Sequence, residues 1–510
     1  MKEYSMSELS SEYQGEEKQL LLVRRDAPSP PVGGGTVTNN EILDRYGFGR
    51  YQYLLGLCCG LARTAAFSHI FLCTAVVSNQ NVYWKLSLLE DRMVYTVLAV
   101  FCIVGGVLAG KLADIYGRKR ILLMGTVLSA LAMTIGAITP QYYLFIVCNV
   151  IGGAAIGANL VVGTCLYGEC IPNSHRSYAA VVINAFTWLV NLIICLVNYF
   201  CFHETGWRWH YGLIVIPNIL SFVFTYFLID ESPRYYGMIG YTQGQLYVLT
   251  RIRSWNKPHL TSPFSEDLKS TVISDRGSWK GLMFRFFGAT LATMSIGFMV
   301  TAVITMITFS SPIMIAADYC SLGQVLNLEQ TDLWEESDHF QYLVLSIIYF
   351  SLFIGSLLSH FTLVRNRSRS VSLYFLFVLL LVTLIPQMQC FTTWLLLLSA
   401  VLTMVVVGAI LHIQTLIIIE MFPTYIRGAA FGVIYAATFM GTLYGPYVDI
   451  LINAGSLKSV YAVFFVLSAT TAVLINGGIG GSSDTQTNKI FDNRDDVFGG
   501  ILESREFGEL

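Results

Sequence analysis

Apolar stretches of about twenty residues recur along this chain, and they constrain its fold more than any other feature. A helix that crosses a bilayer needs roughly 20 mainly apolar residues, and it satisfies all its backbone hydrogen-bonding groups internally. We therefore predict an all-α membrane protein with twelve transmembrane helices. The stretches are 52–77, 94–113, 121–138, 143–168, 178–202, 211–229, 286–310, 341–361, 371–388, 393–419, 428–452 and 457–476.

Composition supports a membrane protein and excludes other classes. Hydrophobic residues make up 54% of the chain and charged residues 13%, whereas a soluble protein has about 25% charged residues. The net charge of −2 gives no indication of a nucleic-acid partner. Most cysteines lie in apolar stretches without metal-ligand spacing. A disulfide among Cys201, Cys320 and Cys390 is left open.

Basic residues predict the orientation in the membrane, because Lys and Arg accumulate in cytosolic loops. With the N-terminus inside, 26 of the 31 basic residues are cytosolic and four face the other side. The remaining one, Arg63, lies within the first span. The segment of about 311–340 has six acids and no basic residue, so it is expected on the non-cytosolic side. Both termini are therefore expected in the cytosol.

Spacing divides the spans into two sets of six on either side of a long basic segment. The expected parts are a disordered cytosolic tail (1–50), a six-helix lobe (51–229), a cytosolic central loop (230–285), a second six-helix lobe (286–476) and a cytosolic C-terminal tail (477–510). Both lobes contain E-x-x-P-x-x-x-R, at 169–176 and 420–427, 251 residues apart. The same offset places Arg118 on Arg369. This repetition indicates a two-lobed transporter with its substrate route between the lobes.

Pairs of glycines four residues apart allow helices to approach closely. Such pairs fit a two-lobed transporter, and ordinary helix packing is the alternative for each of them. The pairs are Gly106/Gly110, Gly153/Gly157, Gly428/Gly432 and Gly441/Gly445.

Four motifs resemble those of a known family. The 110–120 stretch, GKLADIYGRKR, is similar to the signature loop of the major facilitator superfamily. The DESPR sequence at 230–234 and the 420–427 stretch resemble motifs of its sugar and organic-ion branches. Residues 47–53 are similar to the segment before the first span in synaptic vesicle 2-related proteins. The resemblance covers about 45–485, and it implies the major facilitator fold and secondary transport.

The chain departs from those relatives at three places. Their first span carries acids where this chain has Ala65 to His69 without one, and Asn149 replaces an arginine that they often carry in the fourth span. The loop after the seventh span is short and has no glycosylation sequon. These differences keep a second interpretation open, in which a transporter-like protein serves as a vesicle-membrane scaffold or receptor.

Charged residues recur at the expected cytosolic ends of the spans. One interpretation is a gate whose ion pairs form in one state and separate in the other. The other is that these charges only anchor loops in the cytosol. The predicted gate comprises Gly110, Asp114, Gly117, Arg118, Glu169, Arg176, Arg369, Glu420 and Arg427.

Polar residues within the spans are the candidates for a substrate pathway. Arg63 lies near the middle of the first span, where a charge is costly and tends to face a cavity or the protein interior. For each neutral residue an interhelical hydrogen bond is the alternative. No Asp or Glu lies near the middle of a span, which favours an anionic, zwitterionic or neutral solute. The candidates are Arg63, His69, Asn149, Asn159, Asn184, Trp188, Asn191, His412, Gln414 and Tyr435.

Enzymatic and ATP-driven functions find no support in the motifs. A phosphate-binding Gly-rich loop, a metal-ligand spacing and a nucleophile triad are all missing, so we expect no cofactor and no metal. In the tail, Glu16, Leu20 and Leu21 resemble an acidic dileucine signal that adaptor proteins bind. The expected protein is a multi-pass transporter of the plasma membrane or intracellular vesicles, whose partners are a small-molecule substrate, the lipid bilayer and an adaptor.

Overall fold

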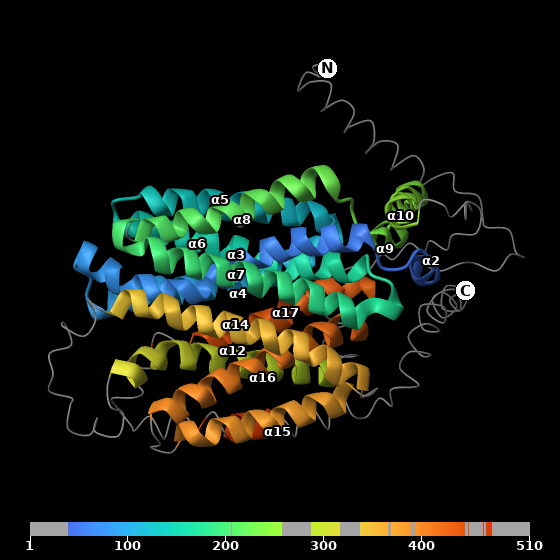
Figure 1. Cartoon of the computed structure of the whole chain (residues 1–510). Coiled ribbons are helices and arrows are strands. Elements are labelled where there is room, and N and C mark those ends of the chain that lie inside the picture. Colours follow the sequence, from blue (N-terminus) through green and yellow to red (C-terminus); the bar gives the residue numbers. More distant parts are fainter. Residues whose placement is uncertain are drawn as a thin grey trace, which may run out of the picture.

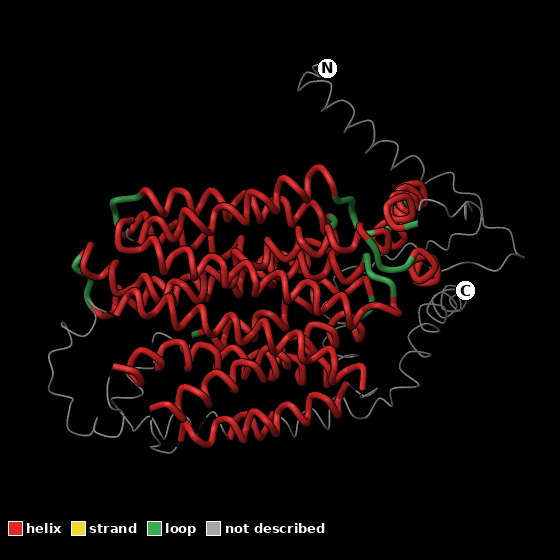
Figure 2. The backbone as a smooth tube through the Cα atoms, viewed as in Figure 1, coloured by secondary structure: helices red, strands yellow, loops and turns green. Residues whose placement is uncertain are grey.

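The structure is a computed structural model in which long helices lie side by side in one bundle (Figure 1). It describes residues 39–205, 207–257, 287–316, 337–365, 369–388 and 393–443, together with 447, 463 and 466–471. Within these ranges every regular element is helical (Figure 2). This agrees with the apolar composition, because a helix satisfies its own backbone in a bilayer.

The helices form two lobes that follow the order of the chain, as the colours of Figure 1 show. The first lobe contains α3 (Arg50–Trp84), α4 (Leu88–Tyr116), α5 (Arg118–Ile138), α6 (Tyr142–Glu169), α7 (Arg176–Thr205) and α8 (Trp207–Leu228). The second contains α12 (Phe287–Ala316), α14 (Ser337–Arg365), α15 (Arg369–Met388), α16 (Thr393–Met421) and α17 (Thr424–Thr442).

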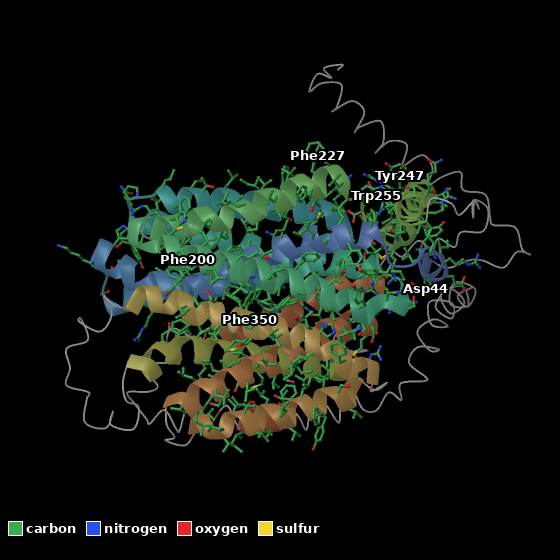
Figure 3. All side chains as sticks on the ribbon, viewed as in Figure 1. Asp44, Phe200, Phe227, Tyr247, Trp255 and Phe350 are labelled. Carbon is green, nitrogen blue, oxygen red and sulfur yellow. The ribbon has the colours of Figure 1, made fainter. Side chains whose placement is uncertain are left out.

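Eleven of the predicted spans coincide with these helices, and most of the twelfth, 457–476, lies outside the described residues. Nine helices of the described part are long and apolar enough to cross a membrane. Large aromatic side chains such as Phe200, Phe227 and Phe350 are exposed on the sides of the bundle (Figure 3). Such a surface suits a lipid environment, so the prediction of an all-α membrane protein is confirmed.

Three shorter helices lie beyond one end of the bundle, here called the α10 end (Figure 1). They are α2 (Asn39–Tyr46), α9 (Pro233–Met238) and α10 (Thr242–Asn256). The prediction of a disordered tail up to residue 50 is therefore wrong for α2, and the predicted central loop begins with two helices.

Burial and hydrogen bonds explain why these short helices are ordered. Helix α2 buries Ile42 and Leu43, and the Asp44 carboxylate (Figure 3) accepts hydrogen bonds from the Ser174 amide and hydroxyl at 3.0 and 2.8 Å. At the end of α10, the Asn256 amide donates to the Gln52 side chain at 2.7 Å. The Arg251 guanidinium donates to Asp230 at 2.8 Å. These contacts involve long sequence separations, which periodicity alone does not reveal.

The lobes meet mainly where α4 packs on α17 and where α7 packs on α14. Glycines bring α4 and α17 into backbone contact. A Cβ atom on Gly428 would lie 2.5 Å from the carbonyl oxygen of Gly110, and one on Gly432 would lie 2.9 Å from that of Gly106. Two of the predicted glycine pairs therefore face each other between the lobes.

The other glycine pairs pack differently. Gly153 and Gly157 lie against α4 within the first lobe, and Gly441 lies against α12 within the second. Gly445 lies outside the described residues. Ordinary packing within a lobe explains these positions.

Aromatic side chains make the contact between α7 and α14. The rings of Trp188 and Tyr349 stack with their centroids 6.2 Å apart, and nearer the α10 end Tyr178 meets His360 at 5.9 Å. The Tyr349 hydroxyl also donates to the Phe67 carbonyl of α3 at 3.3 Å. This contact between the lobes, unlike the glycine contact, depends on side-chain conformation.

The glycine contact leads to a first prediction. Gly428→Ala places a methyl group against the backbone of α4, and overpacking of this kind costs about 1–3 kcal/mol. We expect a lower midpoint of thermal unfolding, followed by intrinsic tryptophan fluorescence in detergent.

Gly212→Ala is the matched control, because a Cβ atom there meets nothing within 4 Å. Replacing a helical glycine by alanine is favourable by up to about 1 kcal/mol, so the control variant should unfold at the native temperature or slightly above it. Equal midpoints for Gly428→Ala and the native protein would contradict the close contact.

Candidate functional site

The turn between α4 and α5 brings charged side chains together at the α10 end. Gly117 makes this turn with φ at +107°, a conformation that favours glycine. The Glu231 carboxylate accepts hydrogen bonds from the amides of Arg118 at 3.0 Å and Lys119 at 2.9 Å. It thereby caps the N-terminus of α5. Burial raises the pKa of the Glu231 carboxyl, and the Ser232 amide opposes that shift.

Arg118 is the centre of the charge cluster and is fully buried. Its guanidinium donates to Asp114 at 3.0 Å and to Glu169 at 3.1 Å. It also lies over the Tyr235 ring, 4.8 Å from the centroid, and the Tyr235 hydroxyl donates to the Ile115 carbonyl at 2.9 Å. Two carboxylates and an aromatic face thus compensate the cation for the water it has lost.

The same cluster reaches across to the second lobe. The Asp114 carboxylate accepts from the amides of Gly428 at 3.2 Å and Ala429 at 3.0 Å. Arg118 donates to the Thr424 carbonyl at 3.0 Å. An Arg427 Nη1 atom lies 3.7 Å from the Glu169 carboxylate. All of these partners lie in the first turns of α17, so the cluster holds α17 against α4 and α6.

The second half contains a related pair. Arg369 donates to Glu420 at 3.1 and 3.3 Å. Both residues lie 251 positions after Arg118 and Glu169, so the repeat in sequence recurs as a repeat in contacts. This second pair is partly exposed and stays within its lobe, with side-chain exposures of 33% and 24%. Arg176 lies at the first position of α7, at the same end of the bundle.

Arg63 lies in the interior of the first lobe and is 2% exposed. Its Nη1 atom donates to the Thr164 hydroxyl of α6 at 2.6 Å, and its Nη2 atom donates to the Asn184 oxygen of α7 at 2.9 Å. Its guanidinium lies 6.0 Å from the centre of the Phe67 ring. Among the described residues, no carboxylate reaches this cation.

Most of the other predicted pathway residues hold neighbouring helices together. His69 and Asn149 share a hydrogen bond of 3.0 Å, and the Ser68 hydroxyl donates to the Asn191 oxygen at 2.5 Å. Further bonds run from Asn159 to Ser129 and from Gln414 to the Thr293 carbonyl. Tyr435 stacks on Phe431 of its own helix, and His412 is buried beside Ala180 of α7. Only Arg63, Asn184 and Trp188 of the predicted set form one continuous cluster with Phe67.

Some residues of both clusters were not predicted. The DESPR resemblance was the only signal for Glu231, and nothing in the spacing singled out Tyr235 or Thr164. Several predicted features lie outside the described residues, namely Glu16, Leu20, Leu21, Cys320 and Cys390.

The sequence matches known proteins along most of its length. Residues 53–328 match the family described as Major Facilitator Superfamily. The "Putative transporter svop-1" of Caenorhabditis elegans is 22% identical over 87% of this chain and 84% of its own. The "Organic cation/carnitine transporter 7" of Arabidopsis thaliana is 27% identical over 45% of each chain. The "Synaptic vesicle 2-related protein" of Xenopus laevis is 23% identical over 50% of this chain and 49% of its own.

The fold matches a solved structure of similar size. This is the xylose transporter XylE from E. coli in a partially occluded inward open conformation. It is 15% identical, has a TM-score of 0.60, and is covered over 99% of its length by 84% of this chain. The matched family spans more than half of the sequence, and the predicted signature loop forms the centre of the charge cluster. The chain therefore belongs to the Major Facilitator Superfamily, and its sequence relatives include synaptic vesicle 2-related proteins.

Proposed function

We propose that this protein is a secondary transporter that moves a small organic solute by alternating access, without a cofactor. The α10 end faces the cytosol, in agreement with the distribution of basic residues. The protein resides in the plasma membrane or in intracellular vesicles, and its tail signal binds an adaptor. The observation that carries the transport proposal is the cluster of Asp114, Arg118 and Glu169, which holds α17 from the other lobe.

The energetics of this cluster suit a gate. Burying charges is costly, and their mutual attraction and hydrogen bonds offset that cost only when the geometry is good. When the lobes separate, water reaches the charges at the same time as the contacts between the lobes are lost. Hydration of the charges then offsets the loss of those contacts. The closed and open states therefore differ by a small free energy, and a ligand can shift their ratio.

Contacts between the lobes at the opposite end complete the arrangement. The Thr96 and Tyr447 hydroxyls lie 3.1 Å apart, and the Arg92 guanidinium lies 5.9 Å from the centre of the Tyr447 ring. Tyr95 meets Phe309 with ring centroids 5.7 Å apart. Alternating access requires that the contacts at the two ends break in turn.

The second candidate function is a scaffold or receptor that has kept the transporter fold. Two observations favour it. The Ala65 to His69 run has no acid, and the second copy of the signature loop, from His360 to Arg369, has diverged. A scaffold does not need to open at both ends, so accessibility distinguishes the two functions.

Cross-linking provides that test on a cysteine-free background. Tyr178→Cys with His360→Cys locks the α10 end, and Thr96→Cys with Tyr447→Cys locks the opposite end. A third cysteine replaces Tyr349, which is fully buried between the lobes. We expect each cross-link to block labelling of this central cysteine from one side only, measured with an impermeant maleimide in oriented proteoliposomes.

Without a cross-link, the central cysteine should react from both sides. Labelling from neither side would overturn alternating access and support the scaffold. The measurement needs no knowledge of the substrate.

The gate leads to a paired mutational prediction. Glu169→Gln removes a charge shared by Arg118 and Arg427, and a change of 1.4 kcal/mol alters a ratio of states about tenfold. We expect faster labelling of the central cysteine from the α10 end, by about tenfold.

Glu420→Gln is the control, because its partner Arg369 belongs to the same lobe. It should change that rate by less than about twofold, since a partly exposed pair contributes at most about 1 kcal/mol and does not join the lobes. Equal effects of the two substitutions would remove the gating role of Glu169.

Orientation has its own test. Ser254 on α10 and Lys85 at the opposite end are both exposed. In cells with the protein at their surface, we expect a cysteine at 85 to react with an impermeant reagent directly. A cysteine at 254 should react only after permeabilisation, and the reverse pattern would invert the proposed topology.

A further inference from the structure

Polar side chains join α3 to α7 at three successive levels along the two helices. At two of these levels the buried polar groups all have hydrogen-bond partners. At one level the Thr64 hydroxyl donates to the carbonyls of Gly60 and Thr187. At another, the Ser68 hydroxyl donates to the Asn191 oxygen, and the Asn191 amide donates to the Thr187 carbonyl at 2.7 Å. Buried polar groups are normally paired in this way.

The level of Arg63 is different. Arg63 Nε, Asn184 Nδ2 and Trp188 Nε1 are buried, and none of them has an acceptor within the described part of the chain. The three side chains are neighbours. Arg63 donates to Asn184, Trp188 follows Asn184 by one helical turn, and the Phe67 ring lies 4.7 Å from the Trp188 ring.

All three unpaired atoms are donors, and the acceptors around them are already used. The Asn184 oxygen accepts from Arg63, and a flipped amide would point its NH₂ group at a guanidinium that can only donate. The Thr164 hydroxyl accepts from Arg63 and donates to the Leu160 carbonyl at 2.7 Å. A ligand that pairs with these donors must therefore bring acceptor atoms, whereas a cation would meet the like charge of Arg63.

The same side chains supply flat apolar surfaces. Phe67, Trp188 and Tyr349 form a continuous row of rings from α3 through α7 to α14. Tyr349 belongs to the second lobe, and its stack covers Trp188, which is fully buried. Separation of the lobes therefore uncovers the Trp188 side chain, which lies beside Phe67 and one helical turn from Asn184.

We infer that Arg63, Asn184 and Trp188 form an oxyanion site for an organic anion with a flat apolar body. The carboxylate, sulfonate or phosphate of the ligand accepts hydrogen bonds from Arg63 Nε, Asn184 Nδ2 and Trp188 Nε1. Its body replaces Tyr349 in the stack on Trp188, beside the Phe67 ring. This inference deepens the transport proposal and rests on it for the separation of the lobes.

Matched small molecules test the charge requirement. The purified full-length protein in lipid nanodiscs is titrated with benzenesulfonate and benzoate, with the neutral benzenesulfonamide, and with the cation benzyltrimethylammonium. We expect both anions to quench tryptophan fluorescence and to raise the thermal midpoint. Their affinity should exceed that of the sulfonamide by about tenfold or more, and the cation should not bind.

Two variants separate a ligand site from a structural role. Asn184→Asp places a carboxylate against Arg63, so the protein should stay folded while anion affinity falls by about tenfold or more. Trp188→Phe keeps a ring and removes one donor, which should lower anion affinity about threefold to tenfold.

The controls carry the same changes elsewhere. Asn173→Asp adds a carboxylate beside Arg234 at the α10 end, and Trp209→Phe alters an exposed ring. Both should keep anion affinity within about twofold. For Trp188→Phe, anion affinity is measured from the shift of the thermal midpoint, because this measurement does not depend on the fluorophore that the substitution removes.

The outcomes separate this inference from the proposed function. If neither anion binds, or if Asn184→Asp keeps the native anion affinity, the oxyanion site is wrong even when both ends of the protein open. If the anions bind as expected while the central cysteine is labelled from one side only, the site is right and the protein is a receptor rather than a transporter.

Discussion

The packing of helices at the α10 end depends on the interactions of one fully buried charge, the guanidinium of Arg118. It joins α4, α5 and α6 of one lobe through Asp114 and Glu169, and it reaches the backbone of α17 in the other. An unpaired cation at this position would be very costly, so each partner must stay close. The tight glycine turn, the capping carboxylate of Glu231 and the Tyr235 ring all serve to keep this one charge compensated.

Comparison of the two halves shows which charged contacts belong to the first half alone. Arg118 and Glu169 recur as Arg369 and Glu420 in the same pairing. The position that corresponds to Asp114 is Arg365. The acid that binds the α17 amides therefore has no equivalent in the second half, and the pair there stays within its lobe. A symmetric fold thus carries an asymmetric set of charges.

Much of the fold was predictable because membrane helices are encoded locally. Hydropathy located eleven helices, and motif spacing located the charges from Asp114 to Arg427. Hydropathy did not predict α2 and α10, since their order comes from distant partners such as Ser174 and Gln52. Arg63 stood out as a costly charge. The unpaired atoms of Arg63, Asn184 and Trp188 are all hydrogen-bond donors. This could be seen only from the coordinates, because it depends on which hydrogen bonds are already made.

The two seams between the lobes differ in what must change when they part. Where Gly110 and Gly106 face Gly428 and Gly432, backbone lies against backbone and there are no rotamers to rearrange. Where Trp188 meets Tyr349, rings must unstack and find new positions. At the glycines, side-chain entropy therefore does not change when the helices part, whereas at the aromatic contact it does. In the proposed rocking motion, the aromatic contact accordingly contributes an activation entropy that the glycine contact lacks.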